Sequence, residues 1–360
     1  MANSTLTSKP RSSNLELYRI VCMFLILSGH SVFNSGLLPE VWCSLSPKAL
    51  FVYSYGIWGK TGINCFLMIT GYFMCNSNIT VRKYLKLWLE IIFYNIFIGG
   101  IFFLTDYQGY IFSDFINNMW PIHSITDGFV SCFLLFYLLI PFLNRLINAI
   151  DSKLHRNLII LLLFIYTVLS IIPNFQISFN YISWFSVIYL ISAYIRRYPS
   201  KIYKNNNVKV WGGLAILSVL VSYLSVIFCI VLSRRGIEIR PFHFLIDSNA
   251  IFAVVTAFCS FMFFKNLRLP HIPIINTIGS TTFGILCIHA NNDTIRYFIW
   301  NDIIDCRVMY NNPNFCLYII IACVLLFFLC SILDWIRMNT VEKFFFVFLD
   351  KYIFTKNYDK

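Results

Sequence analysis

The chain has 360 residues, of which 58% are hydrophobic, 18% are aromatic and only 12% are charged. A soluble domain carries roughly twice that charged fraction, so the composition excludes a soluble fold, and lipid must be the solvent for most of the chain. The formal net charge of +12 does not indicate nucleic-acid binding, because the basic residues form short clusters between apolar runs, which is how membrane topology is encoded.

Ten apolar segments follow one another along the chain, and each predicts a membrane-spanning helix. We therefore expect an all-α fold, a polytopic integral membrane bundle of about ten transmembrane helices. The fourth, fifth, sixth and ninth segments are short for a bilayer. The predicted spans are Leu17–Leu37, Leu50–Met74, Leu85–Leu104, Gly128–Leu146, Asn157–Pro173, Tyr181–Ile195, Val210–Leu232, Ser248–Phe264, Ile275–Asn291 and Phe315–Ile336.

The distribution of charge predicts that both termini are cytoplasmic. With the N-terminus inside, about three quarters of the 28 lysine and arginine residues fall in inside segments, as the positive-inside rule expects. The loop with Arg234, Arg235 and Arg240 departs from the rule. It either binds an anionic partner outside or shows that the seventh span is misplaced, and we favour a partner. The basic residues expected outside are Lys48, Lys60, Arg234, Arg235, Arg240, Arg296 and Arg307.

Arg19 and His30 in the first span are the pair of residues that most strongly suggests a functional site. Ionisable groups at membrane depth are costly and suggest a function. These two residues are about three helical turns apart, so they share one face, with His30 roughly 16 Å deeper. We expect both to border one connected pocket. A phosphate-bearing donor could meet Arg19, while the imidazole acts as a base toward a hydroxyl. The alternative is a topology anchor at Arg19 and a packing histidine at His30.

The second span and the residues after it supply further polar groups. Asn64 and Thr70 lie in this apolar span and can form hydrogen bonds across helices. Tight packing without chemistry is the more common role of such residues. Arg82, Lys83 and Lys86 then form a basic cluster that is either a cytoplasmic topology signal or a phosphate-binding patch.

The ninth span ends in polar residues at the expected outer surface. His289 lies at the end of this span, followed by Asn291 and then Arg296. A histidine in this place is more often a hydrogen-bonded interfacial residue than a catalyst. The twelve cysteines show no metal-ligand spacing, so no metal site is expected. After Arg337, aromatic residues alternate with lysine and aspartate, which is typical of an interfacial amphipathic helix.

Four motifs together resemble the membrane-bound acyltransferase 3 family, bacterial enzymes that O-acetylate cell-surface glycans. The spacing from Arg19 to His30 resembles the family signature of a basic residue, ten others and a histidine. In the second-helix motif Thr70 replaces the usual serine. After that helix Lys83 and Lys86 stand where the family often has two arginines, which keeps the charge but loses a bidentate grip on phosphate. The matching segments are Leu15–His30, Gly62–Phe73, Phe136–Asn144 and Ser280–His289.

The resemblance implies the parts of an enzyme in a bacterial inner membrane. Residues 15–338 would form a transmembrane acyltransferase domain between cytoplasmic tails at 1–14 and 339–360. No cofactor would be bound permanently, and acetyl-CoA would enter from the cytoplasm as co-substrate. The acceptor would be a hydroxyl of a surface or lipid-linked glycan, such as an O-antigen or capsule. Membrane lipid is the other expected partner, and nucleic acid is not one.

The resemblance also assigns roles to the polar residues. Arg19 and the Arg82, Lys83 and Lys86 patch would hold the coenzyme's phosphates. His30 would act as general base or transiently take the acetyl group. The residues expected to face the acceptor are Asn64, Thr70, His289, Asn291 and Arg296.

Two non-acyltransferase classes compete with this hypothesis. A flippase or other transporter of lipid-linked glycans would also place cations in its cavity, but such proteins usually have more spans. A glycan polymerase is polytopic too, although it tends to carry one large outer loop with arginines, and no loop of that size is present.

Overall fold

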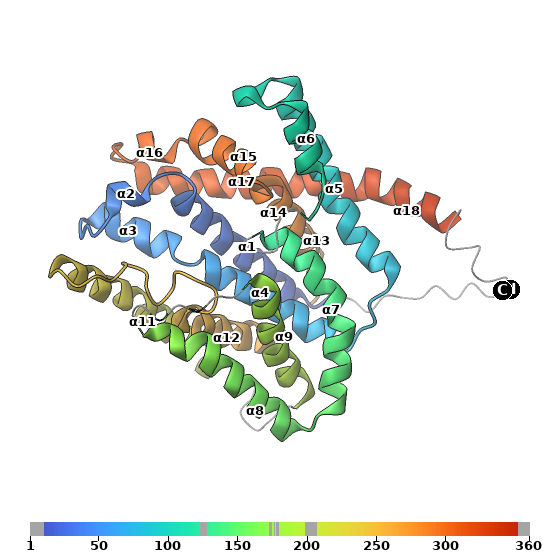
Figure 1. Ribbon diagram of the computed structural model, residues 1–360, viewed down its shortest axis with the longest axis horizontal. Helices are drawn as coiled ribbons and strands as arrows, with labels where there is room; N and C mark the ends of the chain where they lie inside the picture. The colour runs from blue at the N-terminus through green and yellow to red at the C-terminus, as the bar shows by residue number, and fades with distance from the viewer. Residues whose placement is uncertain are drawn as a thin grey trace.

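A computed structural model describes residues 11–122, 128–172, 175, 177, 180–198 and 207–351. Residues 1–10 and 352–360 of the two expected tails, and Pro173 at the end of the fifth span, lie outside the described residues. The described secondary structure consists of helices without strands, which confirms the all-α prediction for this part of the chain (Figure 1).

In the described part of the chain, six helical segments are long and apolar enough to cross a membrane, and each coincides with a predicted span. They include α17 (Phe315–Arg337), which continues through the π-helical turn η5 (Met338–Glu342) into α18 (Lys343–Leu349) without a break. The predicted amphipathic tail therefore begins as an extension of the last span. The other five are α1 (Ser13–Phe33), α5 (Val81–Leu104), α7 (Phe129–Ala149), α8 with η2 and η3 (Ser152–Leu163, Phe164–Val168 and Leu169–Ile171) and α11 (Val208–Arg234).

The four other predicted spans coincide with shorter helices. The sixth and eighth are single helices, whereas the second and the ninth are each divided into two. These helices are α3 (Pro47–Gly56), α4 (Gly59–Met74), α9 (Tyr181–Arg197), α12 (Ile251–Asn266), α13 (Pro273–Ser280) and α14 (Thr282–Ala290). Short segments at loops complete the chain: α2 (Leu38–Val41), η1 (Tyr107–Gly109), α6 (Phe112–Met119), α15 (Asp293–Tyr297), η4 (Phe298–Ile303) and α16 (Cys306–Met309).

Hydroxyl side chains explain why the ninth span is divided at Thr281. The hydroxyls of Ser280, Thr281 and Thr282 each donate to a backbone carbonyl three residues earlier, at 2.6, 2.8 and 2.9 Å. Such local bonds compete with the helical hydrogen-bond ladder. The Thr281 hydroxyl also lies 2.8 Å from the Ser331 hydroxyl of α17. A hydrogen bond therefore links the break in the ninth span to the last span.

Helix α1 is the centre of the bundle, because it packs against α3, α4, α12, α13, α14 and α17. Two glycines allow its closest contact. A Cβ atom added at Gly29 would lie 2.8 Å from the Cα atom of Gly59 on α4, and one added at Gly62 would lie 2.9 Å from the Cys22 carbonyl. The backbones of α1 and α4 therefore touch, as small residues permit between membrane helices.

A buried ionic cluster joins α5 to α17. The Arg337 guanidinium lies 2.8 Å from Asp334 and 3.0 Å from both Glu90 and Glu342. The Tyr94 hydroxyl donates to Asp334 at 2.7 Å. Removing one partner from such a cluster leaves an uncompensated buried charge, so this cluster fixes the C-terminal end of α17 against α5.

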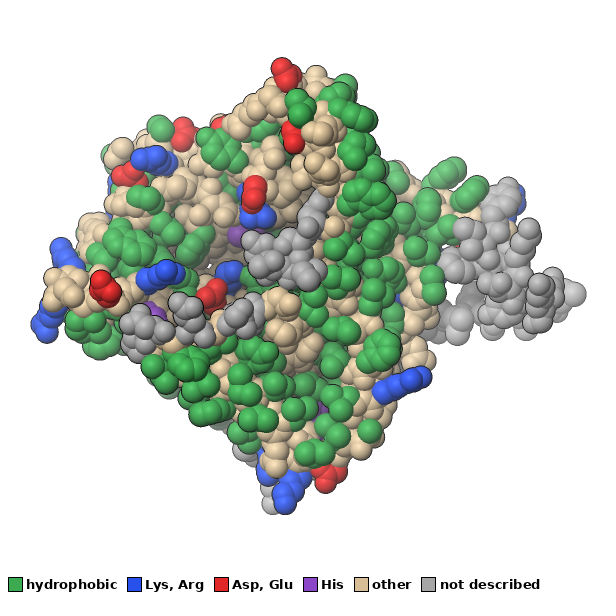
Figure 2. Space-filling view, viewed as in Figure 1, with side chains coloured by type: hydrophobic (Ala, Val, Ile, Leu, Met, Phe, Trp, Pro, Cys, Tyr) green, Lys and Arg blue, Asp and Glu red, His purple; other side chains and the backbone are tan. Residues whose placement is uncertain are grey.

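The outer faces of the bundle suit a lipid environment. Figure 2 shows apolar side chains gathered over α5, α7 and α8, and large apolar residues on these helices, such as Phe97, Phe142 and Leu161, are 57%, 67% and 54% exposed. An apolar surface of this extent is expected for a membrane protein. The same view shows charged side chains of both signs around a hollow.

Candidate functional site

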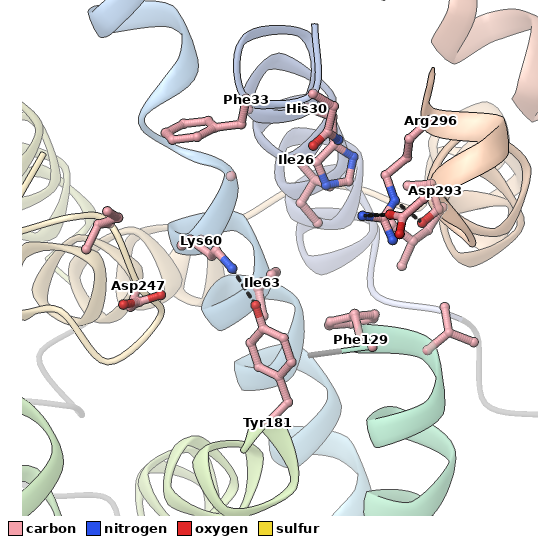
Figure 3. A pocket seen from close by; sticks show the side chains of 18 of the residues that line it. Ile26, His30, Phe33, Lys60, Ile63, Phe129, Tyr181, Asp247, Asp293 and Arg296 are labelled. Atoms are coloured by element: carbon pink, nitrogen blue, oxygen red, sulfur yellow. Dashed lines mark hydrogen bonds and ion pairs between the residues drawn. The ribbon is translucent and has the colours of Figure 1, made fainter. Parts of the chain in front are cut away.

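The hollow is a cavity of about 800 Å³ at one end of the bundle. Its walls come from α1 and the segment after it, α4, the start of α7, α9, the segment from α14 to α15, and the loop between α11 and α12, with one residue of α6. Figure 3 shows side chains from these elements facing one another across the cavity. The polar groups among the lining residues include His30, Asn34, Lys60, Tyr181, Arg240, Asp247, Asn291, Asp293 and Arg296.

His30 lines this cavity and forms a hydrogen bond with His289. Its Nδ1 atom lies 3.1 Å from the Nε2 atom of His289, and the two rings are tilted with their centroids 5.2 Å apart. His289 itself is fully buried and is not among the cavity-lining residues. The sequence placed His289 on the acceptor side, whereas the structure places it behind His30.

A backbone carbonyl decides how the two imidazoles share their protons. The Nδ1 atom of His289 lies 2.5 Å from the Ile285 carbonyl oxygen, which can only accept, so this nitrogen carries the hydrogen. In a neutral imidazole the other nitrogen is then the acceptor. His289 Nε2 therefore accepts from His30 Nδ1–H, and His30 Nε2 is left without a hydrogen.

This Nε2 atom is free to act on a ligand. It forms no hydrogen bond with a described residue. It is also not fully buried, so a ligand in the cavity can reach it. His30 thus presents a basic nitrogen in a cavity whose walls are largely apolar, which is the arrangement that a general base requires.

Asn291 and Arg296, which the sequence analysis assigned to the acceptor side, line the same cavity. The Asn291 amide donates to Asn95 of α5. The Arg296 guanidinium bonds the Ala290 carbonyl at 3.2 Å and Asp293 at 2.9 Å, so both residues are held by the protein at the cavity wall.

Lys60 is a cavity residue that the sequence analysis did not select. It lies in the first turn of α4, next to Gly59 and its contact with Gly29, and its Nζ atom donates to the Tyr181 hydroxyl at 2.5 Å. The signal was present, because Lys60 falls inside the predicted second span, where a cation is costly. The sequence analysis used Lys60 only as one of the basic residues expected outside the membrane.

Asn64 and Thr70 do not line the cavity. The Asn64 amide donates to the Ser248 carbonyl at 2.6 Å and accepts from the Trp184 indole at 2.9 Å. The Thr70 hydroxyl donates to the Phe66 carbonyl in its own helix. Asn64 therefore ties α4 to α9 and to the loop before α12, and these positions favour a packing role for both residues.

Arg19 and His30 do not border one cavity in the described structure. They share the unbroken helix α1, as predicted, but Arg19 is absent from the lining residues. Its guanidinium lies 3.5 Å from the buried Glu16 carboxylate. Cys22 and Met23, which lie between the two residues along α1, are fully packed.

The basic cluster after α4 lies against the end of the chain. Arg82 pairs with Asp350, Lys86 pairs with Glu342, and Lys83 donates to the Asn78 carbonyl at 2.9 Å. All three line a second cavity of about 460 Å³, together with residues of η5 and α18. No group of histidine, cysteine and acidic side chains suited to a metal ion occurs in the described part of the chain.

Comparison with known protein families gives one match. The model of the acyltransferase 3 family, described as an acyltransferase domain, matches residues 12–336. Comparisons with curated proteins and with solved structures give no match. The matched region runs from the start of α1 to the end of α17, so it contains both histidines and the whole cavity.

Proposed function

The chain belongs to the acyltransferase 3 family, and on this premise we propose that it transfers an acetyl group from acetyl-CoA to a sugar hydroxyl of a cell-surface polysaccharide. The family and the apolar helices make it a multi-pass membrane acyltransferase. The proposal adds the donor, the acceptor and the catalytic base. The acceptor is an O-antigen, a capsule or a lipid-linked precursor.

The observation that carries the proposal is the hydrogen bond of His30 with His289 at the cavity wall, which for neutral rings leaves the Nε2 atom of His30 unprotonated. The Ile285 carbonyl fixes the hydrogen on His289, and His289 fixes the hydrogen on His30 Nδ1. His289 is thus a positioning residue in this proposal, and His30 is the base. A second group that holds the base in one orientation is the usual arrangement in acyl transfer.

The reaction balances with these groups. His30 Nε2 takes the proton of the acceptor hydroxyl as its oxygen attacks the thioester carbonyl. The carbon–oxygen bond forms and the carbon–sulfur bond breaks. The leaving coenzyme thiolate then takes the proton from the imidazolium, which restores His30. General-base help of this kind contributes roughly a hundred- to ten-thousandfold in rate.

The donor side of the proposal uses the basic groups at the other end of α1. Arg19, with the patch of Arg82, Lys83 and Lys86, would hold the phosphates of the coenzyme. Because Cys22 and Met23 are fully packed, donor binding must open a passage beside α1 before the acetyl group meets His30. The ion pairs of the patch with Glu342 and Asp350 would be exchanged for phosphate contacts at the same time.

The proposed topology follows from charge and helix count. Ten spans with both termini in the cytoplasm would place the cavity of His30 at the outer side of a bacterial inner membrane. The shorter helices α9 and α12, and the divided second and ninth spans, would then cross the bilayer alongside the six longer ones. Asn291 and Arg296 would contact the acceptor from that side.

Acetyl content of the surface polysaccharide tests the function. Mass spectrometry of this polymer from cells with and without the gene should show loss of O-acetyl groups, with polymer length and export unchanged. Loss of the polymer itself would instead support a transporter or a polymerase.

A further inference from the structure

The charges in the cavity are unevenly paired. Arg296 has a carboxylate partner, Asp293, at 2.9 Å. Lys60 and Arg240 line the same cavity, and neither has a carboxylate within 4.0 Å among the described residues. Asp247 is the one other acidic residue in the lining, so the cavity holds more positive than negative charge.

Lys60 is fixed next to the catalytic base by the crossing of two helices. The Cα atoms of Gly29 and Gly59 are in contact, and the residue that follows each glycine, His30 or Lys60, lines the cavity. A lysine at this depth without a carboxylate partner is costly. Lys60 donates to the Tyr181 hydroxyl, and the Asp247 carboxylate of the same cavity acts on the ammonium group only from beyond ion-pair distance.

Lys60 and Tyr181 together offer more hydrogen-bond donors than acceptors. The ammonium group donates to the Tyr181 oxygen at 2.5 Å, and it has further hydrogens to donate. Because the Tyr181 oxygen accepts this bond, its own hydrogen is free for a ligand, and it meets no acceptor among the described residues. A group that consists only of acceptors, such as a carboxylate or a phosphate, satisfies such a pair.

The same cavity has an aromatic wall that suits a sugar ring. Phe33, Trp42 and Phe242 line the cavity, with ring centroids 5.4 Å apart for Phe33 and Phe242 and 5.9 Å apart for Trp42 and Phe242. The loop with Phe242 also brings Arg240 into the lining. An apolar wall with a few placed polar groups is the usual form of a small-molecule site.

We propose that the acceptor is an anionic sugar whose carboxylate or phosphate is bound by Lys60 and Tyr181. The role of this sugar as acceptor rests on the proposed function, but its binding does not require acyl transfer. Arg240 supplies a second positive charge at the cavity wall. The anion holds the sugar so that one of its hydroxyls meets His30 Nε2. The loop of arginines that departs from the positive-inside rule is thereby explained in part as a wall of this site.

Ligand-induced thermal stabilisation of the full chain in detergent tests this proposal. The probes are glucose, glucuronic acid and glucose 1-phosphate at equal concentrations, without acetyl-CoA, on the wild type and on the transfer-deficient His30→Ala variant. We expect at least one acidic probe to raise the unfolding temperature of both proteins, and glucose to raise it far less. The probe that binds shows whether the anion is a carboxylate or a phosphate.

Variants of Lys60 connect the binding to this residue. Lys60→Gln should weaken binding of the acidic probe by about ten- to hundredfold, the value of one charge-assisted hydrogen bond, and Lys60→Arg should retain most of it. Tyr181→Phe, which keeps the ring, should weaken it by a smaller factor. Lys48→Gln is the matched control, because Lys48 also lies 5.2 Å from a tyrosine ring, that of Tyr310, but outside the cavity.

The proposal is overturned if neither acidic probe binds, if glucose binds as well as the acidic probe that binds better, or if Lys60→Gln binds that probe like the wild type. Failure of the proposed function would give a different pattern of results: the acidic probe would still bind through Lys60, but no polysaccharide would lose acetyl groups when the gene is deleted.

Discussion

The Nδ1 atom of His30 lies 3.1 Å from the Nε2 atom of His289. The first histidine borders the cavity, and the second is fully buried behind it. His289 Nδ1 is bonded to the Ile285 carbonyl. The Nδ1–H group of His30 therefore points to His289, the Nδ1–H group of His289 points to Ile285, and both point away from the cavity. This arrangement gives the two histidines different roles and separates their predicted effects.

Replacement of the base should remove transfer. We expect His30→Ala to lower the acetylation rate by roughly a hundred- to ten-thousandfold, because the acceptor hydroxyl loses its proton acceptor. The rate is measured with labelled acetyl-CoA in membranes that contain equal amounts of protein. His271→Ala, at an exposed histidine, serves as the control and should keep the wild-type rate. Normal transfer by His30→Ala would rule out the mechanism.

Replacement of the positioning histidine should lower kcat more than it raises KM. His289→Phe fills the buried site but cannot accept the hydrogen from His30 Nδ1. The His30 hydrogen is then free to move to Nε2, and the population of the basic tautomer falls. We expect kcat to drop by about tenfold or more, with KM for the acceptor nearly unchanged. Nitrogen NMR of labelled histidine should show the change of tautomer at His30, and an unchanged tautomer together with an unchanged kcat would refute the role.

The contact of Gly29 with Gly59 should not tolerate a methyl group. A Cβ atom at position 29 would lie 2.8 Å from the Gly59 Cα atom, so Gly29→Ala must push α1 away from α4, at a cost of about 1–3 kcal/mol. The unfolding temperature in detergent and the transfer rate should both fall. Gly213→Ala in α11 is the matched control, since its Cβ would meet nothing within 4 Å, and it should be neutral or slightly stabilising. Equal effects of the two variants would show that the helices are not in contact there.

The buried ionic cluster should be far more sensitive than an ion pair at the surface. Arg337→Met leaves Glu90 and Asp334 without their cation, and we expect a loss of about 3–5 kcal/mol in unfolding free energy. Arg307→Met breaks an exposed pair with Glu40, in which the side chains are 65% and 39% exposed, and should cost about 1 kcal/mol or less. Detergent or urea titration of both variants measures the difference. Similar losses would mean that the cluster is solvated.

The sequence predicted the helices better than the contacts between them. Hydropathy and length predicted ten spans, of which the structure confirms six as candidates in the described part of the chain. These six could be predicted because the need to satisfy the backbone in lipid acts on each helix alone. The division of the ninth span at Thr281 could not be predicted in this way. It depends on hydroxyl bonds within the helix and on Ser331, a residue of another helix.

The candidate site shows the same distinction. The spacing of Arg19 and His30 correctly placed both on α1, but it could not show that only His30 meets the cavity. The positive-inside count placed Lys60 among the outer charges and gave no sign that it lines the cavity, and the position of His289 behind His30 depends on packing between helices that sequence spacing does not report. Asn291 and Arg296 were placed correctly at the cavity, since they directly follow a helix end that the motif identified.

The packed stretch of α1 around Cys22 and Met23 has a consequence for the cell. It lies between the basic groups near Arg19 and the cavity that contains His30, and in the proposed topology it would help to keep the permeability barrier of the bilayer closed. An acetyl group taken from the cytoplasm for a sugar outside would therefore have to pass this stretch while the cavity is open to one side of the membrane at a time. If both sides were open together, protons or metabolites would leak across the membrane.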